Sequence, residues 1–318
     1  MTPFRPWQNL LRIVLILAAA TLSACAGVDM SGTCGLEEHY TLPLDMMLGG
    51  RAPVLWVRVN GIDRHFLLDT GGSSSAIERR TALALGLLHD TKSVSMRDVT
   101  GTQNFDTIEI ERVETGGLVF ENKRFLVSNG LPYDGVIGLD LLSDLTLDIN
   151  ELEGRIVAYH GRLCAGQKPI ADAKLIEMPA IRGVKGAGGK PSPHLEVAAR
   201  LNGTLGLAMF DTGAIGGSLV SPVFAAKAGV TPEILASDPE VHPRGFGAVT
   251  TAHLHRFDQL DLDGEIFPKP VLMISSDKGM AFNIIIGADY FHIHRVWLDF
   301  ANDRVFTLPL EQRPSPGS

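Results

Sequence analysis

Two stretches of the sequence carry an aspartate in the same setting. Apolar residues Phe66-Leu-Leu lead into Asp69-Thr70-Gly71, and Leu207-Ala-Met-Phe lead into Asp211-Thr212-Gly213. An apolar run predicts a buried strand, and a glycine behind an aspartate predicts a tight turn. Each copy therefore places one carboxylate at the tip of a loop that leaves a buried strand.

Two carboxylates brought within hydrogen-bond reach could activate a water molecule. They would share one proton, because two adjacent negative charges repel strongly. The ionised carboxylate would take a proton from the water, and the protonated one would donate to the carbonyl oxygen of the bond to be cleaved. We therefore predict Asp69 and Asp211 as catalytic residues of a hydrolase, and we expect neither a metal nor another cofactor.

The surroundings of the two aspartates also repeat. Asn60-Gly61 and Asn202-Gly203 each lie nine residues before an aspartate and predict β-hairpins. Downstream, Ala82-Leu-Ala-Leu-Gly86 and Ala225-Ala-Lys-Ala-Gly229 predict short helices that end at a glycine. One unit of about 120 residues is thus written twice, which predicts two lobes with related folds. Further corresponding pairs are Ile77 and Leu219, Gly117 and Gly264, Gly138 and Gly287, and Arg155 and Arg304.

The paired Asp-Thr-Gly runs, each followed later by two apolar residues and a glycine, resemble the aspartic peptidases of the pepsin and retropepsin clan. Ile284–Val305 is similar to the C-terminal stretch of pepsin-like lobes, and the resemblance covers roughly residues 39–310. It implies an all-β fold of two related barrel-like lobes, with few short helices and an active-site cleft between the lobes. It also implies an aspartic endopeptidase that hydrolyses polypeptides.

The resemblance assigns supporting roles to the residues beside the aspartates. It implies that Thr70 and Thr212 hydrogen bond across the two loops and fix the separation of the carboxylates. Gly71 and Gly213 allow the tight turn and the close approach of the opposite loop. Gly138 and Gly287 would let a strand pass close beneath each loop.

The sequence departs from pepsins directly after the first Asp-Thr-Gly. Gly72 stands where pepsins carry serine, and Ala214 in the second copy is the retropepsin choice. Ser73, one residue later, is the remaining candidate for a hydroxyl that supports the carboxylates. Without such a hydroxyl the pair is less acidic, so we expect a pH optimum nearer neutral than that of pepsin.

A second departure concerns the hairpin that covers the cleft. Pepsins use one hairpin with a tyrosine, but this sequence has no tyrosine between Tyr40 and Tyr133. Two glycine-containing segments instead suggest a retropepsin-like pair of flaps within one chain. The candidate substrate-binding residues on them are Val99, Gly101, Thr102, Phe246, Gly247 and Val249.

Composition and charge fit this picture. The chain of 318 residues has 45% hydrophobic and 20% charged residues, as globular proteins do, and its length favours two domains. A net charge of −8 argues against nucleic acid as a partner and weakly against anionic membrane surfaces. We expect a signal peptide at 1–24, a linker at 25–39, lobe 1 at 40–160, a connector at 161–173, lobe 2 at 174–310 and a tail at 311–318.

The N-terminus predicts export. Arg5 and Arg12 are positive charges before the apolar run Ile13–Ala20. This run is too short to span a bilayer but suits a secretory signal. The following Leu-Ser-Ala-Cys25 resembles a bacterial lipobox, which implies lipidation of Cys25 and a periplasmic protein anchored to the outer membrane. The alternative is a plain signal peptide with an incidental cysteine.

Two further cysteines remain after Cys25. In an oxidising compartment Cys34 and Cys164 could form a disulfide, and the alternative is two unpaired thiols.

Two other functions are open to this sequence. The pairs His253/His255 and His292/His294 could place imidazoles on one face for a metal, although polar strand faces explain them more simply. The fold could also serve as a catalytically silent scaffold that binds peptides or cell wall. Since both carboxylates lie in one chain, we expect a monomer.

Overall fold

The computed structural model describes residues 35–47, 52–88, 91–98, 101–182, 192–245 and 248–310. All of them belong to one compact unit, Gly35–Ser318. The predictions for the signal peptide, Cys25, Cys34 and the tail lie outside the described residues. None of the helices in this described part is long and apolar enough to cross a membrane.

The first lobe is an eight-stranded sheet in the order β2-β3-β4-β9-β5-β8-β7-β6. Strand β3 also pairs with β7, which closes a barrel-like ring. The elements of this lobe are β2 (Leu44–Met46), β3 (Ala52–Val59), β4 (Ile62–Leu68), β5 (Ala76–Glu78), α3 (Arg79–Ala84), β6 (Lys92–Asp98), β7 (Gly101–Thr115), β8 (Leu118–Ser128), β9 (Gly135–Ile137) and α4 (Leu139–Leu142).

The second lobe repeats this plan with shorter strands, and α5 is followed there by a further short helix, α6. Its strands follow the order β13-β14-β23-β15-β22-β19-β16, with the hairpin β20–β21 attached to β13. A separate two-stranded hairpin, β17–β18, belongs to the same part of the chain. The elements are β13 (Leu195–Leu201), β14 (Thr204–Phe210), β15 (Leu219–Val220), α5 (Pro222–Lys227), α6 (Pro232–Ser237), β16 (Glu240–Val241), β17 (Arg244–Gly245), β18 (Ala248–Val249), β19 (Ala252–Arg256), β20 (Gln259–Leu262), β21 (Glu265–Pro268), β22 (Val271–Ser275), β23 (Ile284–Ile286) and α7 (Ala288–Phe291).

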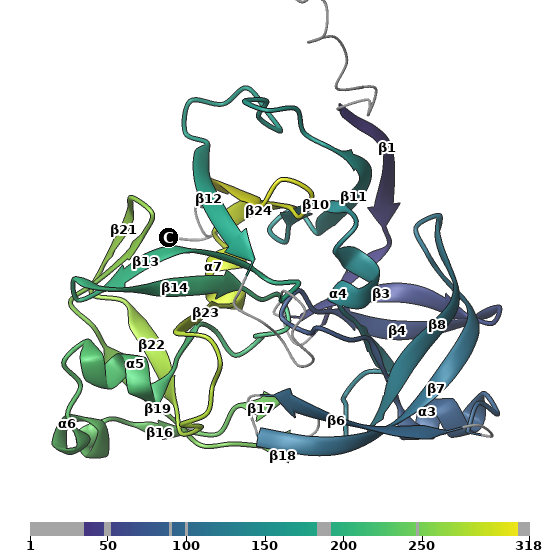
Figure 1. Cartoon of the computed structure of the whole chain (residues 1–318), viewed down its shortest axis with the longest axis horizontal. Coiled ribbons are helices and arrows are strands. Elements are labelled where there is room, and N and C mark those ends of the chain that lie inside the picture. The colour runs from purple at the N-terminus through teal and green to yellow at the C-terminus, as the bar shows by residue number, and fades with distance from the viewer. Residues whose placement is uncertain are drawn as a thin grey trace, which may run out of the picture. The chain divides into compact units, whose positions relative to one another are not determined.

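A third layer joins the two lobes. Its strands β1 (Gly35–Leu42), β11 (Arg155–Arg162), β10 (Thr146–Asn150), β24 (His294–Asp299), β25 (Arg304–Pro309) and β12 (Ile176–Arg182) pair in this order. Figure 1 shows this sheet above the two lobes, with strands of the first half of the chain on one side and of the second half on the other. The all-β fold with two barrel-like lobes and few short helices is therefore confirmed, with a shared sheet that the sequence analysis did not predict.

The shared sheet corrects one predicted boundary. The described part of the expected linker 25–39 is not a linker, because β1 begins at Gly35 and pairs with β11 from Gly35↔Arg162 to Leu42↔Ile156. Pairing with the edge of β11 satisfies backbone groups that a linker would leave to water.

Within the shared sheet, an ion pair links a strand of the first half of the chain to a strand of the second half. Arg295 on β24 donates two hydrogen bonds, of 2.7 and 2.6 Å, to the carboxylate of Asp148 on β10. Asp148 is 1% exposed. A bidentate pair of this kind fixes direction as well as distance, so it holds one register between the halves.

Each aspartate-bearing strand enters from the predicted hairpin. Asn60 and Gly61 have φ of 45° and 85°, and Asn202 and Gly203 have φ of 48° and 78°. Positive φ at both central residues is the requirement of a tight type I′ hairpin turn. The two hairpins, β3–β4 and β13–β14, thereby deliver Leu68 and Phe210 to the start of the two Asp-Thr-Gly loops.

The apolar strand before each later glycine lies beside the aspartate-bearing strand. Strand β9 runs parallel to β4, with Leu68↔Ile137, and β23 runs parallel to β14, with Phe210↔Ile286. Both sets of side chains are buried in the core. Residues distant in sequence are thereby stacked directly below each loop.

The strand pairing also corrects the correspondence of Ile77 with Leu219. Ile77 pairs with Gly135, whereas Val220 pairs with Ile284, the counterpart of Gly135. Ile77 therefore corresponds to Val220, and the second loop contains one residue more than the first. Both loops end in a strand at the same place because the sheet pairing, not the spacing from the aspartate, decides the register.

The predicted short helices exist but begin earlier than expected. Helices α3 and α5 end shortly before Gly86 and Gly229, whose φ values are 69° and 98°. Ser221 caps α5 by accepting a hydrogen bond from the Phe224 amide, and Pro222 opens the helix. Pro222 is favoured at this first position because its missing N–H is not needed there.

Candidate active site

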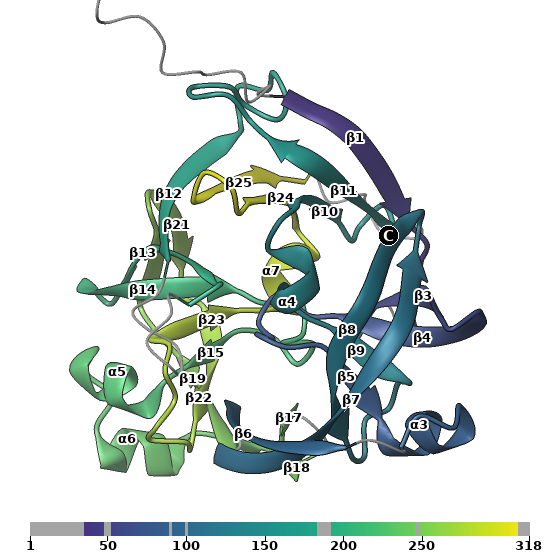
Figure 2. The same ribbon diagram turned by 45° about the vertical axis from the view of Figure 1, so that its right-hand side comes forward.

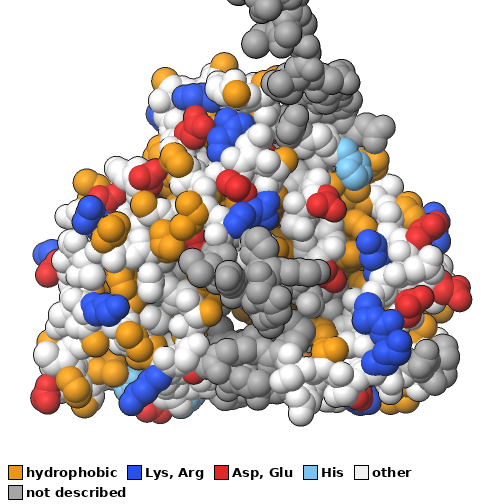
Figure 3. Space-filling model, viewed as in Figure 1, with side chains coloured by type: hydrophobic (Ala, Val, Ile, Leu, Met, Phe, Trp, Pro, Cys, Tyr) orange, Lys and Arg blue, Asp and Glu red, His pale blue; other side chains and the backbone are white. Residues whose placement is uncertain are grey.

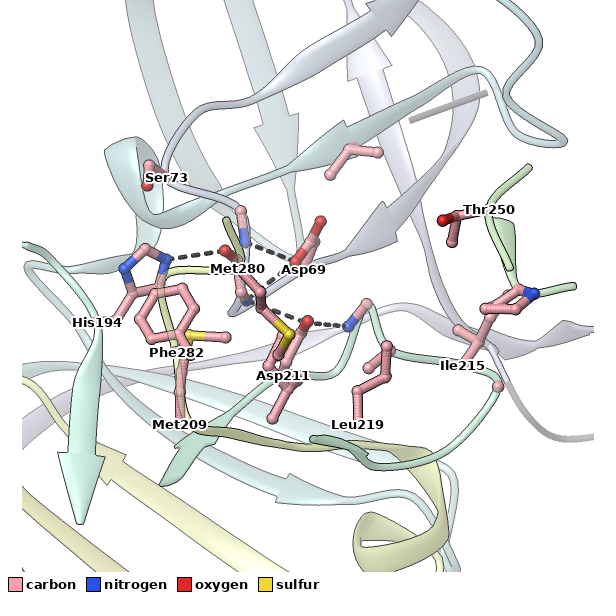
Figure 4. A pocket seen from close by; sticks show the side chains of 18 of the residues that line it. Asp69, Ser73, His194, Met209, Asp211, Ile215, Leu219, Thr250, Met280 and Phe282 are labelled. Carbon is pink, nitrogen blue, oxygen red and sulfur yellow. Dashed lines mark hydrogen bonds between the residues drawn. The ribbon is translucent and has the colours of Figure 1, made fainter. Parts of the chain in front are cut away.

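The two Asp-Thr-Gly loops meet at the centre of the described unit. The Gly71 amide lies between the carboxyls and contacts both, at 2.9 Å from Asp69 Oδ1 and 3.1 Å from Asp211 Oδ1. Each carboxyl also affects the pKa of the other. Figure 4 shows the two aspartates next to each other in one pocket. The structure thus brings together the two predicted catalytic residues.

The two threonines hold the loops together from below. Thr70 Oγ1 donates to the Phe210 carbonyl at 2.9 Å, and Thr212 Oγ1 donates to the Leu68 carbonyl at 2.7 Å. Each hydroxyl also accepts from the backbone amide of the other threonine at 3.1 Å. Four buried hydrogen bonds therefore cross between the halves, as the resemblance implies.

The glycines of both runs are needed because each lies against the opposite aspartate. A Cβ added at Gly213 would lie 2.6 Å from Asp69 Cγ, and one added at Gly71 would collide with Asp211 Cγ. Any side chain there would push the carboxyls apart.

Burial changes the acidity of both carboxyls. Desolvation raises the pKa of Asp69, against which the hydrogen bonds from Asp211, Gly72 and Gly71 act. Desolvation and the nearby charge of Asp69 together raise the pKa of Asp211 well above its usual range. Since both pKa values are raised, the two carboxyls hold one proton between them.

The first loop supports Asp69 without a hydroxyl. Asp69 Oδ1 accepts hydrogen bonds from the backbone amides of Gly71, at 2.9 Å, and Gly72, at 2.7 Å. Ser73 is exposed, and Figure 4 shows it set apart from both aspartates. The candidate role of Ser73 as a supporting hydroxyl is therefore not realised, because the turn points its side chain toward the cavity rim.

A second layer of serines and aspartates lies behind the loops. Ser75 Oγ donates to Asp140 Oδ1 at 2.7 Å and accepts from the Gly138 amide at 3.0 Å. Ser218 repeats both bonds with Asp289 and Gly287 at the same distances. The sequence analysis did not identify these serines, because the extra residue in the second loop puts Ser75 and Ser218 at different distances from Asp69 and Asp211.

An imidazole beside the pair was also missed. His194, from the segment that precedes β13, is 5% exposed. Its Nε2 lies 2.8 Å from the carbonyl oxygen of Gly71, and its Nδ1 lies 2.6 Å from Ser192 Oγ. A histidine in an irregular segment gave no pattern that could have identified it.

The aspartates line a cavity of about 370 Å³ between the lobes. Its walls are mostly apolar. They include Phe105, Leu126, Leu131 and Val136 from the first lobe and Met209, Leu219, Met273, Phe282 and Ile285 from the second.

Both predicted flaps correspond to hairpins. Hairpin β6–β7 closes at Asp98↔Gly101, and β17–β18 pairs Gly245 with Ala248. Figures 1 and 2 agree in showing the two hairpins side by side. Gly101, Thr102 and Val249 lie on these strands, while Val99, Phe246 and Gly247 lie outside the described residues, and a substrate-binding role for all six stays a prediction. The cavity is lined near the hairpins by Phe105, Pro243 and Thr250.

The paired histidines have other partners. His255 Nδ1 lies 2.7 Å from Asp238 Oδ2, and His294 Nε2 lies 2.7 Å from Glu265 Oε1. Among the described residues no three His, Cys, Asp or Glu side chains gather as metal ligands would.

Cys164 is disulfide-bonded. Its predicted partner, Cys34, lies outside the described residues.

Comparison with known proteins agrees with the first half of this site. Residues 55–144 match the family model of a gag-polyprotein putative aspartyl protease. This match supports an aspartic protease family for this segment, which contains Asp69. The solved structure described as "Crystal structure of edgp" aligns with a TM-score of 0.49 and 11% identity over 86% of this chain and 95% of that chain. A comparison with curated proteins gave no match.

The threonine bonds predict a specific loss of stability. Thr212→Val leaves the buried Leu68 carbonyl and Thr70 amide without partners, so the free energy of unfolding should fall by about 2–3 kcal/mol. Urea denaturation measures this. Thr204→Val is the matched control, since the exposed Thr204 hydroxyl donates only to the Lys227 carbonyl at 3.3 Å and its loss should cost under about 0.5 kcal/mol. Equal effects of the two changes would contradict the role given to Thr212.

The shared proton predicts how stability depends on pH. Because folding raises the pKa of Asp211, the folded state keeps a proton that the unfolded chain releases above about pH 4. The stability that this proton contributes is present in acid and is lost as pH rises, by up to about 1.4 kcal/mol per pH unit. Asp211→Asn has no such proton to lose, so its stability relative to the natural protein should increase from pH 4 upward. Thermal unfolding at a series of pH values tests this, and a constant difference would contradict it.

Proposed function

We propose that this protein is an aspartic endopeptidase in which Asp69 and Asp211 activate one water molecule. The observation that carries the proposal is the pair itself: two carboxyls from related loops, bridged by the Gly71 amide and exposed to one cavity. The match of residues 55–144 to an aspartyl protease model supports the same class of reaction.

The geometry suits the two roles that hydrolysis needs. Asp69 Oδ1 accepts amide hydrogen bonds from Gly71 and Gly72, and Asp211 Oδ1 accepts them from Gly213 and Gly71. The Gly71 amide, which contacts both carboxyls, lies closer to Asp69, at 2.9 Å against 3.1 Å, so we assign the charge and the role of base toward the water to Asp69. Asp211, which holds the shared proton, donates to the carbonyl oxygen as the tetrahedral intermediate forms. When the intermediate collapses, a proton passes to the leaving nitrogen and the C–N bond breaks.

The walls of the cavity point to the substrate class. Among the described lining residues the charged side chains are Asp69 and Asp211, and both walls are otherwise largely apolar. Charged side chains would lose hydration there without a partner. We therefore infer cleavage between apolar residues of an extended polypeptide that lies under the two hairpins.

The surface gives no support for a nucleic-acid substrate. On the face in Figure 3, positive and negative side chains of the described residues are interspersed rather than gathered in a basic stripe. Together with the net charge of −8, this favours polypeptide over nucleic acid.

A catalytically silent scaffold is the second candidate. It would use the apolar cavity to bind peptides or cell wall and keep the carboxyls without turnover. Binding without cleavage would identify it.

Cleavage of a mixed peptide library by the protein without residues 1–24 tests the first proposal. We expect cuts between apolar residues, no effect of a chelator, and inhibition by a statine-type compound. Asp69→Asn and Asp211→Asn should each lower kcat by about a thousandfold or more, because each removes a proton-transfer group. The control Asp63→Asn, at an exposed residue paired with Arg58, should keep full activity. Cleavage that survives both active-site changes would refute the proposal.

We also propose that the protein is an exported monomer anchored through Cys25 in the periplasm, on the basis of the lipobox resemblance and the presence of both aspartates in one chain. The natural protein should incorporate labelled fatty acid and sediment with membranes. Cys25→Ser should lose the label and the membrane association, whereas Cys34→Ser should keep both. If the natural protein carries no label and stays in the soluble fraction, the lipid anchor is refuted and residues 1–24 are a plain signal peptide. Light scattering measures the mass of the particle in solution, and a mass above that of one chain would refute the monomer.

A further inference from the structure

His194 occupies a buried position at the wall of the catalytic cavity. It lines the cavity and packs edge-on against Phe282, with ring centroids 5.0 Å apart. Figure 4 shows a dashed line from the His194 ring toward the loop that carries Asp69. Its position therefore gives it access to the backbone of that loop rather than to solvent.

The hydrogen bonds determine which ring nitrogen carries the proton. A carbonyl oxygen only accepts, so Nε2 must carry the hydrogen that it donates to the Gly71 oxygen at 2.8 Å. Ser192 Oγ accepts from the His194 backbone amide at 3.3 Å, which leaves its own hydrogen to point to Nδ1 at 2.6 Å. In the neutral ring Nδ1 is then the acceptor. Burial lowers the pKa of His194, which agrees with this state.

The bond to Gly71 acts on Asp69 through one peptide group. The Gly71 carbonyl and the Gly72 amide belong to the same peptide, and that amide donates to Asp69 Oδ1 at 2.7 Å. A hydrogen bond accepted by the carbonyl polarises the amide and strengthens the bond that the amide donates. The chain of contacts thus runs from Ser192 through His194 and the peptide to the Asp69 carboxylate.

The two related halves of the chain differ in this contact. His194 belongs to the second half and contacts the Asp-Thr-Gly loop of the first half. His194 lies eight residues before Asn202, and the residue eight before Asn60 is Ala52. Ala52 is fully buried and has no side-chain donor. The related hairpins therefore differ at this position: the first lobe places no imidazole beside the second loop, and its contact with Asp211 is the Gly71 amide at 3.1 Å.

We propose that His194 is a positioning residue that makes Asp69 the ionised member of the pair, in place of the hydroxyl that the first loop lacks at Gly72. Its catalytic consequence rests on the proposed peptidase function, but its effect on Asp69 does not. Among the described residues, the titratable side chains that share the cavity with His194 are Asp69, Asp211 and Tyr133, and burial raises the pKa of Tyr133. Glu196 lies two residues along the chain, and its pKa is also raised by burial.

The test measures the pKa of Asp69 directly. In the Asp211→Asn variant Asp69 titrates without its partner, and carbon-13 NMR of its carboxyl follows it. Adding His194→Phe keeps the packing on Phe282 but removes the donor, so the Asp69 pKa should rise by roughly half a unit. Adding His194→Gln restores a donor and should return the pKa toward its starting value. Ser192→Ala should raise it less than His194→Phe.

Controls separate this inference from loss of folding and from the proposed function. His160→Phe, at an exposed histidine on β11, should leave the Asp69 pKa unchanged. In the unmutated protein, nitrogen-15 shifts of His194 should show the neutral form protonated at Nε2. An unchanged Asp69 pKa in a folded His194→Phe variant, or a proton at Nδ1, would overturn the proposal. If peptides are not cleaved but the pKa moves as stated, the peptidase proposal fails while this inference stands.

Discussion

The structure depends on holding two carboxyl groups together in a partly buried place. This arrangement is stable only if the two carboxyls keep one proton between them and if the loops that carry them stay at a fixed separation. The crossed bonds of Thr70 and Thr212 supply this constraint, since each hydroxyl is tied both to the backbone amide of the other threonine and to a carbonyl of the opposite half. Because these groups are buried, breaking any one bond leaves a polar group without water, and the loops stay in register.

The rest of the fold makes this contact possible. Strands β9 and β23 lie beneath the loops, and the shared six-stranded sheet joins the halves on the side away from the hairpins. The bidentate pair of Asp148 with Arg295 ties β10 to β24 within that sheet. Contacts between the halves therefore occur at two levels, one at the carboxyls and one in the sheet, and a shift at one level would disturb the other.

The approximate two-fold relation between the halves is broken beside the two carboxyls. The halves agree in their hairpins, their threonine bonds and their Ser75 and Ser218 layers. They differ in the imidazole of His194 and in the additional residue of the second loop. Equal environments would give two carboxyls with equal affinities for the shared proton, whereas unequal environments give the two carboxyls different proton affinities.

Much of this site could be predicted because it depends on local properties of the chain. Asn-Gly at both hairpins sets positive φ, apolar runs form buried strands, and the repeated Asp-Thr-Gly identifies the two aspartates. The sequence also indicated that Gly72 removes a hydroxyl, but not what replaces it. The two hairpins β6–β7 and β17–β18 could be predicted from glycines between polar segments. The residues that line the cavity beside these hairpins could not be predicted from the sequence.

What the sequence by itself determined is the pair of loops, the strands that carry them and the kind of chemistry two such acids can perform. The tertiary structure alone decided that Ser75 corresponds to Ser218, that β1 joins a shared sheet, and that His194 contacts Gly71. The physical reason is that turns and buried strands follow from neighbouring residues, whereas a hydrogen bond between distant segments depends on the register and packing of every strand between them.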